Sequence, residues 1–262
     1  MSDELTYSSY LGLDRLLNMQ TPRSDPAEHD EMLFIVIHQT YELWFKQVLH
    51  ELDHLKVCLS RNELWQAVPV LKRVRMIVKT LVGQVDILET MTPMSFSSFR
   101  DRLDRASGLQ SVQFRELEFA LGYKRADVVE PIRPGTPHRE ELMRRLTERS
   151  VIDHFYDFLE KRGVAIPSEL RAKEPAASNV PNAQVQDGLV HLYKTQPETT
   201  ILLELMTDVD EGLQEWRYRH VKAVERTIGH KLGTGGSAGV EFLKRSLFQP
   251  LFPDLWAIRH RL

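Results

Sequence analysis

The sequence predicts an all-α protein: a single-domain helical bundle over residues 1–262, built on three long helices with shorter helices around them. Two observations support this prediction. Apolar residues recur every three or four positions over three long stretches, which is the spacing of a helix with one buried face. No stretch alternates apolar and polar residues between turn signals, as a half-buried strand would. With 262 residues, 42% of them apolar, the chain is long enough to bury a sizeable core.

The chain begins with a short predicted helix over residues 6–19 that is rich in aromatic side chains, among them Tyr7 and Tyr10. Such an arm packs either on its own body or on a neighbouring subunit. The first long helix is predicted from Ser24-Asp25-Pro26, which offers a cap and a proline at the first helical position, to about Ser60. His38 lies on or beside its apolar stripe, where a histidine bonded to the backbone is the usual explanation.

Two further long helices are predicted on either side of the middle of the chain. The first covers residues 63–91, with Asn62 as its cap, a kink at Pro69 and a stop at Pro93. The other covers residues 198–228 and carries a second histidine, His220, within its apolar stripe. Shorter helices are expected over residues 95–105, 110–121, 137–146, 150–162, 183–194 and 240–247. Residues 164–182 are rich in proline and alanine and are expected to form a mobile surface segment.

Composition excludes several classes of partner. A net charge of −3 and a pI near 6.4 give no electrostatic reason to expect nucleic acid or an acidic membrane. No apolar run approaches the ~20 residues that cross a bilayer, and the acidic residues 1–4 do not resemble a secretory signal. The single cysteine, Cys58, permits no internal disulfide. We therefore expect a cytoplasmic protein that binds neither membrane nor nucleic acid.

One motif invites an interpretation as a metal site. His50-Glu51-Leu52-Asp53-His54 has the H-E-x-x-H pattern of zinc peptidases, in which two imidazoles on one helical face bind zinc. No third ligand follows it, and Leu49, Leu52 and Leu55 form the buried edge of this helix. An exposed charged face is therefore the better interpretation, and a zinc peptidase or a non-catalytic helical interaction module is kept as the alternative class of function.

Other candidate residues remain open on spacing alone. Arg100 lies in an aromatic stretch and could pair with Asp101 or Asp104, or clamp a carboxylate ligand. The glycine-rich residues 233–239 follow a helix rather than a strand, which argues against a dinucleotide loop and leaves a flexible loop that closes on a ligand or a plain connector. A lone Cys58 on a helix is most often a packing residue, so His220, among apolar and aromatic neighbours able to wall a porphyrin, is the better candidate for an axial haem ligand.

Taken together, these stretches resemble the tryptophan 2,3-dioxygenase family over nearly the whole chain. They follow one another in family order and with family spacing. The matching segments are Leu5-Thr6-Tyr7, Tyr10-Leu11, His29-Asp30-Glu31-Met32-Leu33-Phe34-Ile35, His38-Gln39-Thr40, Leu88-Glu89-Thr90-Met91-Thr92-Pro93, Phe99-Arg100-Asp101, Ser107-Gly108-Leu109-Gln110-Ser111, Trp216-Arg217-Tyr218-Arg219-His220 and Gly233-Thr234-Gly235-Gly236-Ser237.

The resemblance implies an all-helical homotetramer, a dimer of dimers, with one haem b in each subunit's bundle. Such an enzyme inserts both atoms of O₂ across the indole C2–C3 bond of L-tryptophan, giving N-formyl-L-kynurenine, the first step of tryptophan degradation by the kynurenine route. A related haem oxygenase that acts on a substituted tryptophan or another aromatic amino acid is the alternative within this superfamily.

The resemblance also implies a role for each matching site residue. His220 matches the axial haem ligand, and Ser107 matches a residue lining the haem cavity. His38 matches the distal histidine, which hydrogen-bonds the indole N–H and does not ligate the metal. The implied substrate contacts are made by Arg100 on the carboxylate, Thr234 on the ammonium and carboxylate, Phe34, Phe96 and Leu103 around the indole, and Tyr7, Tyr10 and Leu11 from a neighbouring subunit's arm.

Two positions depart from the bacterial pattern of this family. Phe96 stands where many bacterial members carry a tyrosine whose hydroxyl helps hold the substrate carboxylate. Val85 replaces a tryptophan that is often found on the second long helix. With Phe96, more of the carboxylate recognition is expected to fall on Arg100 and Thr234.

Overall fold

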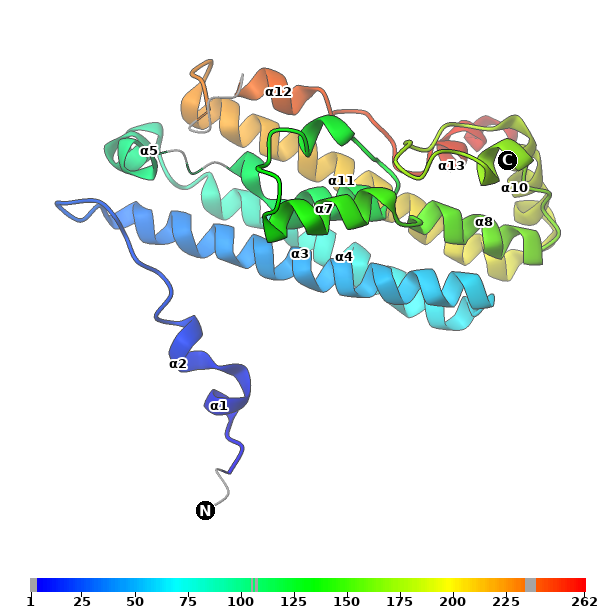
Figure 1. The fold of residues 1–262 in the computed structure, drawn as a ribbon, viewed down its shortest axis with the longest axis horizontal. Helices are drawn as coiled ribbons and strands as arrows, with labels where there is room; N and C mark the ends of the chain where they lie inside the picture. The colour runs from blue at the N-terminus through cyan, green and yellow to red at the C-terminus, as the bar shows by residue number, and fades with distance from the viewer. Residues whose placement is uncertain (1–3, 105, 107, 234–238) are drawn as a thin grey trace.

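The computed structural model describes residues 4–262 except 105, 107 and 234–238, and every regular element among them is a helix. Three long helices form the body: α3 (His29–Arg61), α4 (Leu64–Leu88) and α11 (Pro197–Ile228). In Figure 1 they run along one another for the length of the bundle, and α4 contacts both of the others. The prediction of an all-α fold with three long helices is confirmed.

The first long helix begins at His29, so the predicted start at Ser24-Asp25-Pro26 is wrong. The reason is a contact that crosses the helix start. The carboxylate of Glu31 accepts hydrogen bonds from the backbone N–H of Arg23 at 2.7 Å and of Ser24 at 2.9 Å, and from the Ser24 hydroxyl. These bonds hold the residues before His29 in a non-helical turn, with Glu28 as the N-cap.

Asn62 is predicted to begin a helix and Pro93 to end one, but in the structure each acts at the other end of a helix. Asn62 has φ 60° and ends α3 as its C-cap, while α4 begins after Glu63. Pro93 begins a helix rather than only stopping one: it is the first residue of α5 (Pro93–Arg100), whose N-cap Thr92 accepts a hydrogen bond from the Ser95 N–H. The predicted helix over 95–105 therefore starts two residues earlier, at Pro93. It consists of two elements: α5, which ends at Arg100, and the 3-10 helix η1 (Asp101–Leu103).

The shorter helices cover the long ones (Figure 1). Helix α6 packs on α3 and α7, α8 packs on α3, α10 packs on α11 and α13, and α12 lies on α11. Five of the shorter helices lie within a few residues of their predicted bounds: α6 (Val112–Ala120), α7 (Pro137–Thr147), α8 (Val151–Lys161), α10 (Ala183–Thr195) and α12 (Val240–Lys244). Five short elements were not predicted: η2 (Gly108–Gln110), η3 (Ala126–Val128), α9 (Ser168–Arg171), α13 (Pro253–Ala257) and η4 (Arg259–Arg261).

The main hydrophobic core lies between the three long helices and α8. Leu52, Leu55 and Leu59 of α3 are completely buried there, and each such side chain stabilises the fold by about 1.5–3 kcal/mol. Cys58 is also completely buried in this core. Its thiol therefore serves packing, as its position on a helix suggested.

Residues 164–182, expected to be mobile, are held to the body by a buried lysine. The ammonium of Lys124 donates to the backbone carbonyls of Leu146, Glu148 and Pro175. The first two of these carbonyls lie at the C-terminal end of α7, where a helix leaves carbonyls without an internal partner. One cation thus caps α7 and fixes the segment that follows α8.

The N-terminal arm stands away from the bundle (Figure 1). Gly12, with φ 62°, divides the single predicted helix into α1 (Tyr7–Leu11) and α2 (Leu13–Leu16). Tyr7 is 77% exposed and Tyr10 72% exposed, so these aromatic rings contact little of their own chain. Within the described part of the chain, no helix combines the length and hydropathy needed to span a bilayer.

Candidate active site

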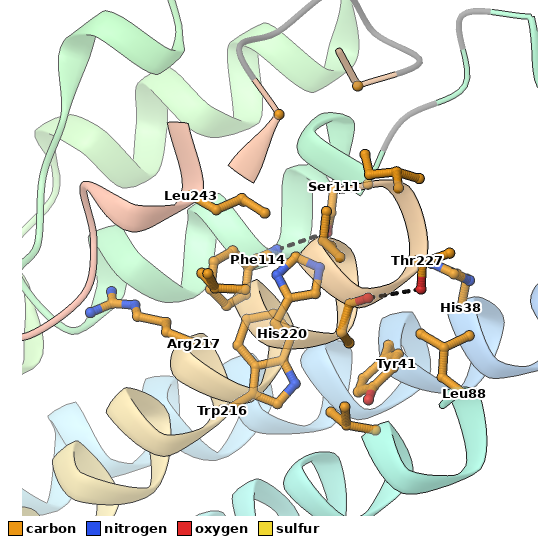
Figure 2. Close-up of a pocket in the computed structure, with 18 of the residues that line it drawn as sticks. His38, Tyr41, Leu88, Ser111, Phe114, Trp216, Arg217, His220, Thr227 and Leu243 are labelled. Atoms are coloured by element: carbon orange, nitrogen blue, oxygen red, sulfur yellow. Dashed lines mark hydrogen bonds between the residues drawn. The ribbon is translucent and has the colours of Figure 1, made fainter. Parts of the chain in front are cut away.

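One end of the bundle contains a cavity whose walls come from α3, α4, α5, α6, α11 and α12. Figure 2 labels residues of all these helices except α5. The side chains around the cavity are mostly apolar and aromatic, which suits a flat apolar ligand. Two histidines face it, one from α3 and one from α11. The aromatic and histidine residues of its wall are Phe34, His38, Tyr41, Phe45, Phe96, Phe114, Trp216, His220 and Phe242.

His220 enters the cavity from α11. Its ring is stacked on that of Trp216, four residues earlier, with the centroids 5.0 Å apart and the planes 8° from parallel. None of the described residues forms a hydrogen bond with this imidazole. Burial, with smaller effects of His38 and Arg115, lowers the pKa of His220 to about 4. The ring is therefore neutral at pH 7, with a nitrogen lone pair free to ligate a metal.

His38 faces the same cavity from α3. Its Nδ1 lies 2.7 Å from the carbonyl oxygen of Phe34, one turn earlier. Because a carbonyl only accepts, Nδ1 carries the proton and Nε2 is left as an acceptor. Burial lowers the pKa of His38 and so favours this neutral form. The ring can accept a hydrogen bond from a ligand N–H, but it cannot donate one through Nε2.

The wall beside His38 is apolar. The ring of Phe34 lies 4.2 Å from that of His38 and 5.6 Å from that of Phe96, measured between centroids. Phe96 in turn packs edge-on against Phe99, and Leu103 lies against this cluster. Together they form an apolar wall next to the hydrogen-bond acceptor of His38.

Arg100 brings a positive charge to the same end of the cavity. Its Nη2 donates to the backbone carbonyl of Leu232, just beyond α11, at 2.6 Å. No described residue forms an ion pair with it, so the predicted alternatives, Asp101 and Asp104, are not its partners. The remaining guanidinium N–H groups are available for an acidic ligand.

Comparison with known proteins identifies the family. The tryptophan 2,3-dioxygenase family model matches residues 1–162 and 133–262. The chain is 53% identical to tryptophan 2,3-dioxygenase of Herpetosiphon aurantiacus over 99% of both chains. It is 51% identical to that of Anaeromyxobacter sp. strain K over 100% of this chain and 97% of the relative, and 39% identical to that of Xanthomonas campestris pv. campestris over 99% and 88%. The chain belongs to the tryptophan 2,3-dioxygenase family.

Six of the residues that the family resemblance pointed to line this one cavity: Phe34, His38, Phe96, Arg100, Leu103 and His220. Two others, Ser107 and Thr234, lie outside the described residues. Tyr7, Tyr10 and Leu11 lie on the arm, away from this chain's cavity (Figure 1). Val85, at the position where family members often have tryptophan, is buried and also lines the cavity.

The H-E-x-x-H pattern forms no metal site in the structure. His50 and His54 are exposed, while Glu51 between them is turned inward and pairs with Arg73 at 2.6 Å. In the described part of the chain, no group of three or more His, Cys, Asp or Glu side chains is arranged to hold a metal ion. The preference for an exposed charged face is confirmed.

Sequence reasoning placed His220 among apolar and aromatic neighbours, which the structure confirms, but it missed a cluster of arginines. Tyr41, Phe45 and Phe114 all pack against Trp216, at centroid distances of 4.8–6.1 Å. The signal for this setting was present, because Trp216 stands four residues before His220 on the same helical face. Three arginines of the lining, Arg115, Arg125 and Arg217, share one buried glutamate; nothing in the local sequence indicates that these charged residues are buried.

Proposed function

We propose that this chain is a haem-dependent tryptophan 2,3-dioxygenase. It inserts both atoms of O₂ across the indole C2–C3 bond of L-tryptophan and releases N-formyl-L-kynurenine, the first step of tryptophan degradation by the kynurenine route. Membership of the family supports the reaction. The observation that carries the proposal is the pair of histidines on one aromatic cavity, His220 with no hydrogen-bond partner among the described residues and His38 with a fixed tautomer.

The cofactor we propose is one haem b per subunit, with His220 as its axial ligand. A neutral, unpartnered imidazole among aromatic rings is a suitable single protein ligand for a metal that brings its other ligands with it. The surrounding rings of Phe114 and Trp216 offer apolar surface to a porphyrin. When bound, the haem supplies the iron that activates O₂.

The chain's own residues bind and orient the substrate. Nε2 of His38 accepts the indole N–H, while Phe34, Phe96 and Leu103 hold the ring. Arg100 clamps the carboxylate in a fixed bidentate geometry, which places the indole against the reacting oxygen. These polar groups discriminate strongly, because a ligand without the matching group leaves them unpaired in a dry site. By resemblance, Thr234 contacts the ammonium and carboxylate, and Ser107 lines the haem cavity.

We further propose that the enzyme is a homotetramer, a dimer of dimers, that works in the cytoplasm. The exposed aromatic side chains of the arm support a subunit contact, since exposed Tyr and Leu clusters usually mark interaction surfaces. In this proposal Tyr7, Tyr10 and Leu11 complete the active site of a neighbouring subunit.

The decisive experiment is turnover by the purified protein. Reduced holoenzyme is mixed with L-tryptophan and O₂, and the product is identified by its mass and its N-formylkynurenine absorbance. A gain of two oxygen atoms is expected. A gain of one atom, or turnover only with a substituted tryptophan or another aromatic amino acid, would assign the alternative haem oxygenase activity. Absence of a Soret band after supply of haem would reject the haem proposal.

The two histidines have separable roles in this proposal. His220→Ala is expected to lose the haem, whereas His38→Ala is expected to keep it and to bind tryptophan more weakly or in another geometry. Loss of the haem in His38→Ala would contradict the assignment of His38 as a substrate residue.

A further inference from the structure

One side of the cavity carries three arginines grouped around a single carboxylate. Glu118 of α6 is 1% exposed and accepts from Arg115 at 2.7 Å, from Arg125 at 3.2 Å and from Arg217 at 2.8 Å. Arg217 also donates to the backbone carbonyls of Ser246 and Gln249, after α12. All three arginines are among the residues that line the cavity.

The charges of this cluster do not balance. Three cations share one anion, and burying an unpaired charge is costly. Among the described residues, the carboxylate of the cavity wall is that of Glu42, which lies one turn after His38 on α3 and accepts a hydrogen bond from the Gln113 side chain at 2.8 Å. Within the cluster itself three arginines share Glu118, which leaves an excess of two positive charges.

Several N–H groups of the cluster have no hydrogen-bond partner among the described residues. The Nε atoms of Arg125 and Arg217 are buried without a hydrogen-bond partner, and Arg217 is 4% exposed. Arg115 makes one bond, through Nη1, and its other N–H groups have no partner among the described residues. The two Nε atoms are enclosed by protein, so the donors that a ligand in the cavity could reach are the remaining N–H groups of Arg115. Because donors in a protein interior are normally satisfied, these groups point to a ligand that accepts from them.

The position of the cluster shows which ligand can reach it. Figure 2 shows Arg217 and His38 on opposite sides of His220. Arg115 lies close enough to His220 to help lower the pKa of that imidazole. The positive charges therefore stand beside the proposed iron ligand, on the side away from His38 and its apolar wall.

The single carboxylate of the substrate cannot contact both Arg100 and the arginine cluster, because these two cationic groups lie too far apart. Arg217 and Ile228 lie eleven residues apart on α11, roughly 16 Å at 1.5 Å per residue. Arg100 bonds the carbonyl of Leu232, beyond the far end of that span. A tryptophan held by Arg100 therefore cannot reach Arg217. The larger ligand of the same cavity, the porphyrin, carries two carboxylates of its own.

We infer that Arg115, supported by Arg125, Arg217 and Glu118, forms the anionic subsite for the carboxylate side chains of the porphyrin. The inference rests on the proposed haem function. The excess of two positive charges matches the two carboxylates that a haem b brings. Glu118 holds the guanidinium groups in place, so that little side-chain entropy is lost when the carboxylates bind.

The test compares haem b with its dimethyl ester, which has the same ring and iron but no charged carboxylate. The full-length protein is loaded with each, and the rate of transfer to an excess of a high-affinity haem scavenger is followed by the Soret band. Charge-assisted hydrogen bonds contribute about 1.5–3 kcal/mol each. The wild-type protein is therefore expected to release the ester roughly 10–100-fold faster than haem b.

Variants then assign the difference to the cluster. Arg115→Gln is expected to speed the release of haem b at least tenfold and that of the ester less than twofold, while Arg115→Lys retains part of the difference. Arg75→Gln is the matched control, because Arg75 pairs with Asp208 on the surface, outside the cavity. In wild type and this control, added salt should speed the release of haem b but not of the ester.

Two outcomes would overturn the inference. If wild-type protein retains both porphyrins equally well, the carboxylates are not bound, although the haem function stands. If Arg115→Gln speeds the release of both by the same factor, the cluster acts only on the fold. The wild-type comparison needs no variant, so a misfolded Arg115→Gln protein does not block the test. Failure of wild type to bind either porphyrin would reject the proposed function itself.

Discussion

The imidazole of His220 is stacked on the indole of Trp216, with ring centroids 5.0 Å apart and planes 8° from parallel. An imidazole rotates freely about its last torsion unless something holds it. Trp216 holds the imidazole by stacking on it, and Trp216 is itself fixed because Tyr41, Phe45 and Phe114 pack around it. Trp216 is therefore a positioning residue for the proposed axial ligand.

Replacing Trp216 should therefore loosen the haem without removing its ligand. Aromatic pairs contribute about 0.5–1.5 kcal/mol beyond the area they bury. Trp216→Leu is expected to release haem roughly fivefold to tenfold faster than Trp216→Phe, measured by transfer to a haem scavenger. Equal release rates in the two variants, with equal melting temperatures, would show that stacking has no part in holding His220.

Arg100 should govern affinity for the substrate carboxylate. Because Lys keeps the charge but loses the planar fork, both Arg100→Ala and Arg100→Lys should raise the KM for L-tryptophan. The expected rise is roughly 10–100-fold for Arg100→Ala, the value of a charge-assisted pair. Steady-state kinetics on the reduced holoenzyme measures it.

Arg102→Ala is the control for Arg100. Arg102 lies two residues further on and, among the described residues, donates to the backbone carbonyl of Asp25, at the surface. The KM of the Arg102→Ala variant for L-tryptophan should stay close to the wild-type value. A near-normal KM in both Arg100 variants would remove Arg100 from the substrate site.

Helical periodicity predicted the fold well because the long helices are strongly amphipathic. The stripe of α3 through Ile37, Tyr41, Phe45 and Val48 is buried as its spacing indicates. The start of α3 was wrong because it depends on the bond between Glu31 and Ser24, a contact across seven residues that no local cap rule contains. Helix ends are decided by such competing contacts.

The site was predicted in a different way. Periodicity placed His38 and His220 on buried faces, but it could not bring together residues nearly 200 positions apart, and only the family resemblance joined them. The arginine cluster was missed altogether, because charged residues on a helix ordinarily face solvent. Burial of Arg115, Glu118 and Arg217 arises from how α6 and α11 pack, which the local sequence does not encode.

The exposed arm should hold subunits together. A Tyr or Leu side chain buried in an interface contributes about 1.5–3 kcal/mol, so Tyr10→Ser combined with Leu11→Ser should shift the mass measured by light scattering from tetramer towards smaller species. Met94→Ser is the control, since Met94 is 79% exposed but lies on α5. An unchanged mass with a raised KM would instead assign the arm to the substrate site alone; no change in either would remove it from both.

Lys124 should stabilise the fold through its three carbonyl acceptors. Lys124→Met keeps most of the volume but leaves the carbonyls of Leu146, Glu148 and Pro175 without this donor. The free energy of unfolding is expected to fall by about 2–4 kcal/mol, measured by urea denaturation. Limited proteolysis should cut within residues 164–182 in this variant first. The exposed Lys79→Met serves as control, and equal stability of the two variants would contradict the role of Lys124.

The low pKa of His220 makes a prediction about acid stability. In the unfolded chain a histidine titrates near pH 6.5, whereas the folded haem-free chain holds His220 near pH 4. Between these values the unfolded state binds more protons, so stability falls as the pH drops from 6.5 to 4. The titration of His220 alone should make the free energy of unfolding about 2–3 kcal/mol lower at pH 4.5 than at pH 7.

His220→Leu, which has no titrating group at this position, isolates that contribution. Urea denaturation of the haem-free chain at pH 7 and pH 4.5 should show a smaller loss of stability in the variant, by about 2–3 kcal/mol. Other groups titrate over the same range, among them His38, but they do so in both proteins and largely cancel in the difference. If wild type and variant lose the same stability, His220 is not held neutral by burial. Its lone pair would then be shared with a proton near neutral pH, and it would be a weaker ligand for iron than its position in the aromatic wall indicates.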